Sequence, residues 1–282
     1  MTVRTMAVLG AGTMGHGIAH AAVASGYDSR LYDVSDVQLV KARGVVEEIL
    51  KTAVTLGKGT AADADRALAR LTTTNDLTAA LDGVDFVVEA APERVEIKVQ
   101  LMADIDRLAP PEAIIATNTS ALSITELAGV LARPSRVAGM HFFNPVHKMK
   151  LVEIVRALES STEALDTIEA VARRMGKETV LVREAPGFIT TRVNASIGNE
   201  AFYMLMEGVA SARDIDKALK LGLNHPMGPF ELVDLVGLDT RLSILEYLHR
   251  SMGEKYRPCP LLAQYVKAGR LGKKVGKGVY EY

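Results

Sequence analysis

The chain has 282 residues, of which 48% are hydrophobic and 24% charged, and its formal net charge is −1. This length fits one large domain or two modest ones, and the balanced charge gives no general attraction to nucleic acid or to an anionic membrane. Because no apolar run is long enough to span a membrane, no leader sequence is recognisable and the single cysteine, Cys259, excludes an intrachain disulfide, we expect a cytoplasmic protein without nucleic-acid or membrane partners.

The chain opens with an apolar segment that ends in a glycine-rich turn. Residues 3–9 are predicted to form a strand, and residues 16–25 have a helical pattern. In the G-x-G-x-x-G turn between them, Gly10 allows a tight turn, Gly12 lets the backbone approach a diphosphate, and Gly15 lets the helix pack close to the sheet. The sequence therefore predicts a dinucleotide site at this turn, although an ordinary glycine-rich turn would read similarly. The predicted site consists of Gly10, Ala11, Gly12, Thr13, Met14 and Gly15.

A second predicted strand, residues 27–32, ends at an acidic residue. Asp33 lies 21 residues after Gly12, where a carboxylate accepts hydrogen bonds from the adenosine ribose hydroxyls and repels a 2′-phosphate. This spacing favours NAD over NADP as the cofactor. The alternative is a surface aspartate with no ligand.

Strand and helix patterns then alternate as far as residue 182. This alternation predicts an α/β, Rossmann-type domain with a mostly parallel sheet and helices on both faces. The further strands are expected at 71–74, 84–89, 113–117, 137–142, 151–155 and 178–182, and the helices at 37–56, 61–70, 93–109, 124–130 and 162–175.

The pattern changes at residues 184–187, after which only helical periodicity remains. We expect helices at 190–207, 211–221, 230–236 and 239–252, and hence an all-α domain over residues 186–282 that follows a nucleotide-binding domain over residues 1–185. A helical domain of this size, rich in Leu, Met and Ala, often buries one face against a partner, which favours a homodimer formed through this half.

Four polar residues follow or interrupt the predicted strands of the first domain: Glu93, Ser120, His141 and Glu153. Ligands of open α/β sheets bind beyond the carboxyl ends of the strands. Because Glu153 lies in an apolar strand, its carboxylate is costly to bury without a partner, and His141 is the obvious one. A histidine oriented in this way is suited to remove a hydroxyl proton. The alternative is a structural histidine and a solvent-exposed glutamate.

Several motifs of the chain, in this order, resemble those of one enzyme family. Together they resemble the L-3-hydroxyacyl-CoA dehydrogenases over essentially the whole chain, and most of all the short bacterial 3-hydroxybutyryl-CoA dehydrogenases. The motifs are Gly10-Ala11-Gly12-Thr13-Met14-Gly15, Asn118-Thr119-Ser120, His141-Phe142-Phe143-Asn144-Pro145, Pro186-Gly187-Phe188, His225-Pro226-Met227-Gly228-Pro229 and Gly272-Lys273-Lys274-Val275-Gly276-Lys277-Gly278.

The resemblance implies a two-domain homodimer that interconverts L-3-hydroxyacyl-CoA and 3-ketoacyl-CoA with NAD and without a metal. It implies that His141 is the catalytic base, that Glu153 orients it, and that Ser120 binds the substrate oxygen near the nicotinamide. The acyl-CoA substrate would enter between the two domains. The remaining cofactor contacts that it implies are Glu93, Lys98, Asn144 and Lys274.

The chain departs from the family after Pro186-Gly187-Phe188, where the family has an asparagine that is thought to help position the substrate carbonyl. Thr191 occupies that position here, and Asn194, one helical turn further on, is the other candidate for the same role. This departure leaves the length of the preferred acyl chain open, with a short chain such as 3-hydroxybutyryl expected.

Coenzyme A needs cationic groups for its phosphates. By resemblance we expect Lys51 and Lys58, although each would read equally well as part of a solvated helix face. A dehydrogenase of a free hydroxy or sugar acid, such as L-gulonate, would need no such groups. A non-catalytic relative similar to the lens crystallins would be expected to have lost the glycine turn or the His–Glu pair.

Overall fold

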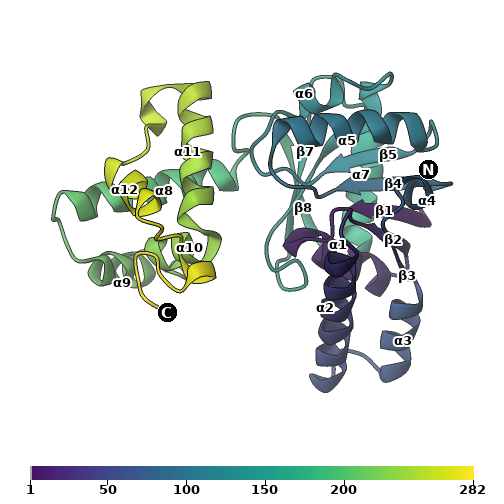
Figure 1. Cartoon of the computed structure of the whole chain (residues 1–282), viewed down its shortest axis with the longest axis horizontal. Helices are drawn as coiled ribbons and strands as arrows, with labels where there is room; N and C mark the ends of the chain where they lie inside the picture. The colour runs from purple at the N-terminus through teal and green to yellow at the C-terminus, as the bar shows by residue number, and fades with distance from the viewer. Residues whose placement is uncertain (1) are drawn as a thin grey trace. The chain divides into compact units, whose positions relative to one another are not determined.

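A computed structural model describes residues 2–282, and the chain divides into two compact units between Glu184 and Ala185 (Figure 1). The first unit is built on a β-sheet and the second on helices, so the predicted fold class is confirmed. No helix in the described part of the chain combines the length and the apolar character needed to cross a membrane.

The first unit contains one eight-stranded sheet. Neighbouring strands are parallel except for the antiparallel pair β6 and β7. Residues 143–150, between these two strands, are too few for a crossover helix, which explains the reversal. The strand order is β3 (Leu71–Thr74), β2 (Asp28–Tyr32), β1 (Thr5–Leu9), β4 (Phe86–Glu89), β5 (Ile114–Thr117), β6 (Val137–Phe142), β7 (Leu151–Arg156) and β8 (Glu178–Arg183).

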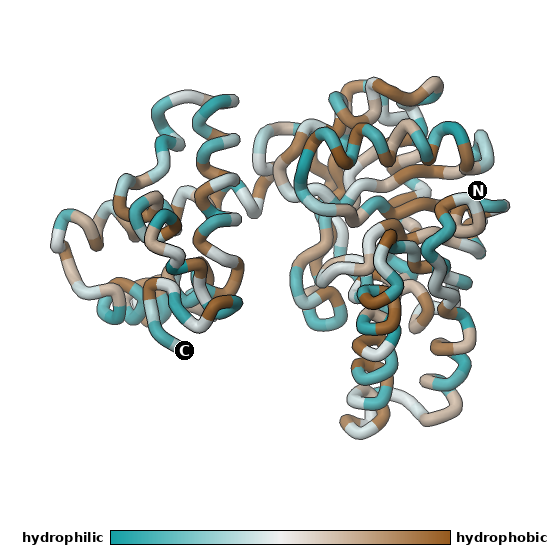
Figure 2. Tube along the Cα trace, viewed as in Figure 1, coloured by the Kyte–Doolittle hydropathy of each residue, from teal (hydrophilic) through white to brown (hydrophobic). Residues whose placement is uncertain are grey.

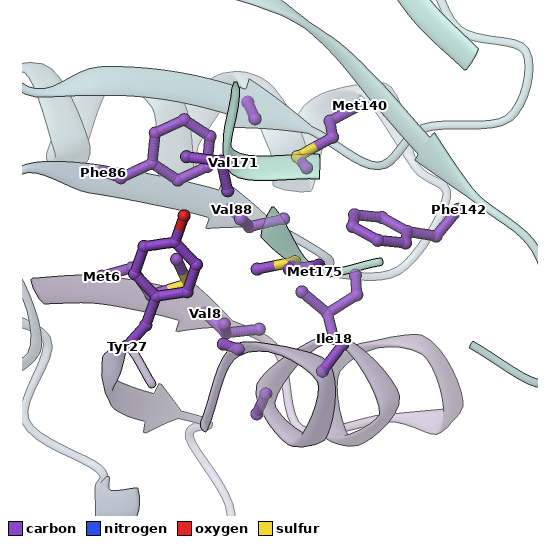
Figure 3. Close-up of a cluster of buried hydrophobic side chains, with 14 of the residues drawn as sticks. Met6, Val8, Ile18, Tyr27, Phe86, Val88, Met140, Phe142, Val171 and Met175 are labelled. Atoms are coloured by element: carbon purple, nitrogen blue, oxygen red, sulfur yellow. The ribbon is translucent and has the colours of Figure 1, made fainter. Parts of the chain in front are cut away.

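One face of the sheet is covered by α1 (Thr13–Ala24) and α7 (Thr162–Arg174). Alternate residues of the strands point to this face because side chains of a β-strand alternate between its two sides. Figure 3 shows Val8 and Val88 of neighbouring strands in the same cluster as Ile18 of α1. A large apolar cluster of the first unit therefore lies on this face, and further buried apolar side chains, such as Val87, Met102 and Ile105, lie outside this cluster.

The opposite face carries α5 (Val95–Leu108) and α6 (Ile124–Ala128). The approach of α6 is close, since a methyl group at Gly139 of β6 would lie 2.6 Å from Cδ1 of Ile124. The strand residues that alternate with those facing α1 and α7 point to this second face. Among them are Glu89, Thr117, His141 and Glu153, so the polar strand residues share one face.

Three further helices follow β2 and β3, and two of them form a hairpin that projects from the sheet (Figure 1). These two are α2 (Asp36–Thr55), which starts at the cap Ser35, and α3 (Ala61–Ala69), which starts with a capping box at Thr60. Apolar and polar residues alternate along α2 (Figure 2), as expected for a helix with one buried side. The third, α4 (Leu77–Leu81), was not predicted from the sequence, because its single turn carries no periodic signal.

The second unit packs its helices around a small apolar core. Phe202 and Phe230 meet edge to face in it, with ring centroids 5.2 Å apart. Helix α12 (Pro260–Lys267) was not predicted from the sequence, because the prolines on either side of Cys259 indicated a loop. In the structure Pro260 lies in the first turn of α12, where a backbone amide hydrogen is not needed. The helices are α8 (Thr190–Met206), α9 (Ala212–Gly222), α10 (Pro229–Val236), α11 (Leu238–Met252) and α12 (Pro260–Lys267).

Two buried aspartates anchor the C-terminal tail to the second unit. Asp234 accepts hydrogen bonds from the backbone amides of Val279 and Tyr280, and Asp216 accepts one from the Tyr280 hydroxyl. The tail runs so close to α10 that a side chain at Gly278 would collide with the Asp234 carboxylate. These bonds hold the residues around Lys274 on the helical unit.

Candidate functional site

The glycines of the first turn serve different purposes. Gly10 has a positive φ of +106°, and a methyl group there would lie 2.6 Å from the Ala90 carbonyl oxygen. A methyl group at Gly15 would lie 1.6 Å from the Gly10 carbonyl oxygen, so helix and turn touch directly. A methyl group at Gly12 would meet no protein atom within 4 Å. The fold therefore requires Gly10 and Gly15, whereas Gly12 faces open space.

Gly12 is the N-cap residue of α1 and no side chain caps this helix, in contrast to α2, where the Ser35 side chain accepts from the backbone amide of Gln38. Thr13 at its start is exposed, Met14 is half-buried and Ala11 is buried. Exposed amides at a helix start, beside a glycine facing open space, match the requirements of a diphosphate. The residues present therefore fit the diphosphate of a dinucleotide.

Asp33 lies beside this turn at the carboxyl end of β2. Its Oδ2 accepts a hydrogen bond of 2.8 Å from the backbone amide of Ala11, and its Oδ1 accepts one of 3.0 Å from the amide of Ser35. Gln38 completes the attachment by donating to the Ala11 carbonyl. The half-buried carboxylate is thus held in a fixed orientation at the turn, with further acceptor capacity on its two oxygens.

His141 and Glu153 form a buried pair on adjacent antiparallel strands. The β6–β7 register places them opposite each other, and Nδ1 of His141 lies 2.7 Å from Oε2 of Glu153. With Glu153 ionised, its carboxylate only accepts, so Nδ1 carries the proton and Nε2 is left as an acceptor. The Phe143 ring packs against the imidazole with ring centroids 4.6 Å apart. This arrangement fixes both the tautomer and the plane of the ring.

Glu89, which the sequence analysis did not single out, is part of a buried network at the end of β4. Its carboxylate accepts hydrogen bonds from Lys98 Nζ at 2.7 Å, from the Thr117 hydroxyl at 2.6 Å and from the amide of Ala91 at 2.7 Å. Glu89 and Lys98 are both at most 1% exposed. The Lys98 ammonium is therefore committed to the protein interior, and the carboxyl ends of β4 and β5 are tied together.

Glu93 connects this network to the loop after β5. Its Oε1 accepts hydrogen bonds from the Thr119 hydroxyl at 2.6 Å and from the Ser120 amide at 2.8 Å, and its Oε2 lies 3.5 Å from Lys98 Nζ. Glu93 is exposed and Ser120 is half-buried, so both are available to a ligand. Three of the predicted site residues, Glu93, Lys98 and Ser120, are thus joined by direct contacts.

The other predicted residues lie apart from this network. Asn144 is exposed in the loop after β6. Lys51 pairs with Glu47 on α2, and Lys58 is exposed in the turn at the end of the α2–α3 hairpin.

In the second unit, Lys274 pairs with Asp239 at 2.6 Å. Thr191 and Asn194 lie on α8, where Asn194 lines an apolar hollow of about 390 Å³.

Comparisons with known proteins agree along the whole chain. Residues 5–185 match the family description "3-hydroxyacyl-CoA dehydrogenase, NAD binding domain", and residues 187–282 match "3-hydroxyacyl-CoA dehydrogenase, C-terminal domain". The chain belongs to the 3-hydroxyacyl-CoA dehydrogenase family. It is therefore an oxidoreductase of 3-hydroxyacyl-CoA with an NAD-binding domain, and the resemblance found in the sequence is confirmed.

Individual relatives cover nearly the full length. The chain is 46% identical to the "Probable 3-hydroxybutyryl-CoA dehydrogenase" of Bacillus subtilis, covering 100% of this chain and 98% of the relative. It is similar to a solved (S)-3-hydroxybutyryl-CoA dehydrogenase of Ralstonia eutropha, with a TM-score of 0.95, 42% identity and coverage of 100% and 99%. It is also 42% identical to the "3-hydroxyadipyl-CoA dehydrogenase" of Escherichia coli, covering 100% of this chain and 60% of that protein.

Proposed function

We propose that the chain interconverts a short L-3-hydroxyacyl-CoA, such as 3-hydroxybutyryl-CoA, and the corresponding 3-ketoacyl-CoA with NAD, and that His141 transfers the proton. The buried contact of 2.7 Å between His141 and Glu153 is the observation that carries this proposal. Family membership favours an acyl-CoA over a free hydroxy or sugar acid. The intact glycine turn and His–Glu pair argue against a non-catalytic relative.

In the oxidising direction, Nε2 of His141 accepts the proton of the 3-hydroxyl group. Glu153 stabilises the imidazolium that forms, because its carboxylate accepts the hydrogen bond from Nδ1. In the reducing direction, His141 returns the proton to the substrate oxygen. Ser120, whose backbone is fixed by Glu93, binds the same oxygen through its hydroxyl and orients it.

The first unit supplies most of the proposed cofactor contacts. The amides at the start of α1 and the space at Gly12 receive the diphosphate, and Asp33 accepts hydrogen bonds from the adenosine ribose. NAD, when bound, takes up the hydride that leaves C3 of the hydroxyacyl group. Glu93, Asn144 and Lys274 contribute further cofactor contacts, and Lys98 acts through Glu93 because it is itself buried.

Two sets of residues are proposed to bind the substrate. Lys51 and Lys58 bind the phosphates of coenzyme A, and their exposure on α2 and the following turn supports this role. On α8, Asn194 faces an apolar hollow and is the better candidate than Thr191 to take over the role of the family asparagine.

The chain also forms a homodimer through the helical unit. Several apolar side chains of this unit are exposed, including Leu223 at 65% and Val193 at 54%. Leu223 also lines a hollow of about 600 Å³. Exposed apolar surface of this kind marks a contact with another protein surface, and a second copy fits the predicted dimer.

The role of His141 is tested by His141→Gln. Turnover should fall by about 10²- to 10⁴-fold, the range for loss of a general acid–base group, while NADH binding persists because the glycine turn is untouched. The matched control is His249→Gln, which removes a histidine paired with Glu254 on the helical unit and should leave turnover unchanged. Near-full activity of His141→Gln would refute the assignment.

A further inference from the structure

The strand that carries His141 extends beyond its neighbour on one side. The last residue pair between β5 and β6 is Thr117 and Gly139, whereas β6 continues to Phe142. On its other side β6 remains paired with β7 as far as Phe142. The end of β6 therefore lacks a backbone partner on the β5 side, at the position of the histidine.

The side chain of Asn118 takes the place of the missing strand. Its Oδ1 accepts a buried hydrogen bond of 2.9 Å from the backbone amide of Phe142. Its own backbone amide donates to the Glu89 carbonyl at 2.8 Å, on the β4 side. Asn118 is only 8% exposed. One residue therefore fastens the end of β6 to the end of β4.

We infer that Asn118 is a positioning residue for His141, an inference that rests on the proposed function of His141 as the proton-transferring group. Phe142 directly follows His141, so the hydrogen bond to Phe142 fixes the peptide unit that joins the two residues. This peptide unit sets the direction in which the imidazole leaves the strand. Asn118 thereby keeps Nδ1 on Glu153 and Nε2 directed at the substrate.

Loss of this bond has two consequences. The Phe142 amide becomes a buried donor without an acceptor, so the end of β6 shifts to find another partner. A shift of about 1 Å at a reacting group costs on the order of 10²-fold in rate. The diphosphate and ribose contacts proposed for the cofactor lie at the turn after β1, away from the end of β6, so this shift should affect NADH binding less than it affects kcat.

The test compares Asn118→Ala with Asn118→Asp and with Asn199→Ala. Asn118→Ala should lower kcat by about 10- to 100-fold with little change in KM for NADH. Asn118→Asp keeps an oxygen that accepts from Phe142 but adds a carboxylate at a buried position, so it should recover part of the lost kcat. Asn199 bonds the backbone of Arg257 and Cys259 in the helical unit, so Asn199→Ala should lower the melting temperature and leave kcat unchanged.

A spectroscopic signature separates positioning from general loss of structure. The His141 Nδ1 proton, hydrogen-bonded to Glu153, should give a downfield NMR signal that is missing in His141→Gln. This signal should shift or broaden in Asn118→Ala, return in Asn118→Asp and stay unchanged in Asn199→Ala.

Wild-type kcat and an unchanged signal in Asn118→Ala, or an Asn118→Asp variant as slow as Asn118→Ala, would overturn the inference. If His141→Gln itself remains fast, the proposed function fails instead. A slow His141→Gln variant beside a fast Asn118→Ala variant refutes only the role of Asn118.

Discussion

Two buried carboxylates at the ends or in the middle of the strands, on the face opposite α1, each have a specific partner. Glu153 contacts His141, and Glu89 contacts Lys98 and Thr117. Because an unpaired buried charge is costly, these partners determine which side chains can occupy the ends of the strands. The chemistry of the site therefore depends on pairs of residues.

His20 on α1 is a histidine in a different situation. Burial lowers its pKa to about 4, and the cationic character of His147 and Lys177 acts in the same direction. Its Nδ1 has no hydrogen-bond partner anywhere in residues 2–282, and its ring lies edge-on to His147. The folded chain therefore keeps His20 neutral at a pH at which the unfolded chain protonates it.

The folded pKa of His20 is depressed, so its contribution to stability is fully present above about pH 6.5 and is lost as the pH falls towards 4. The free energy of unfolding of the wild type, relative to His20→Gln, should fall by about 2 kcal/mol between pH 7.5 and pH 5. Urea denaturation of both chains at each pH measures this difference. A difference that stays constant with pH would show that His20 protonates equally in both states.

At the scale of elements, the turn between β1 and α1 combines packing constraints with an open position. Gly15 touches the Gly10 carbonyl, whereas Gly12 faces open space. Substitution by alanine should therefore separate folding from cofactor binding. Gly44, on the exposed side of α2 with no atom near its missing side chain, provides the control.

Gly15→Ala should lower the melting temperature by roughly 2–10 °C, because overpacking of this kind costs about 1–3 kcal/mol. Gly12→Ala should leave the melting temperature nearly unchanged and weaken NADH binding by about tenfold or more, equivalent to a loss of at least ~1.4 kcal/mol. Gly44→Ala should lower neither the melting temperature nor the affinity for NADH. Thermal melts measure the melting temperature, and fluorescence titration measures the affinity for NADH. A Gly12→Ala variant with wild-type NADH affinity would contradict the placement of the cofactor beside Gly12.

Most elements could be predicted from the sequence because their signals are local. Strand β3 was predicted with its observed bounds. The helix predicted at 211–221 is α9, and the Ser211 side chain caps its start. The short α4 and the proline-initiated α12 were missed, since neither has a long periodic pattern. Sequence patterns therefore predict those helices and strands whose formation is signalled by the segment's own residues.

The candidate site could be predicted only in part, for the same reason. The apolar context of Glu153 pointed to a partner, and the β6–β7 register supplies His141 as that partner. Glu89 and Asn118 were missed because their roles depend on which strands lie side by side and on where a neighbouring strand ends. The position of Asn118 directly after β5, in an Asn-Thr-Ser segment, was the one feature of the sequence that could have pointed to its role.

At the scale of the whole molecule, the exposed apolar surface of the helical unit is the feature to explain. If it is the dimer interface, Leu223→Glu should convert the dimer to a monomer, because a buried unpaired charge would replace a contacting side chain. Leu158→Glu is the matched control, since Leu158 is 77% exposed on the first unit and should not affect the mass. Analytical ultracentrifugation distinguishes the two, and a monomeric wild type would refute the dimer.

In the proposed function, the chain transfers a hydride between NAD and the acyl group of an acyl-CoA. The most direct measurement is the initial rate of NADH oxidation with acetoacetyl-CoA, run beside free acetoacetate and beside NADPH. We predict fast turnover only with acetoacetyl-CoA and NADH. No turnover of acetoacetyl-CoA despite demonstrable NADH binding, or equal rates with free acetoacetate, would contradict the proposed substrate.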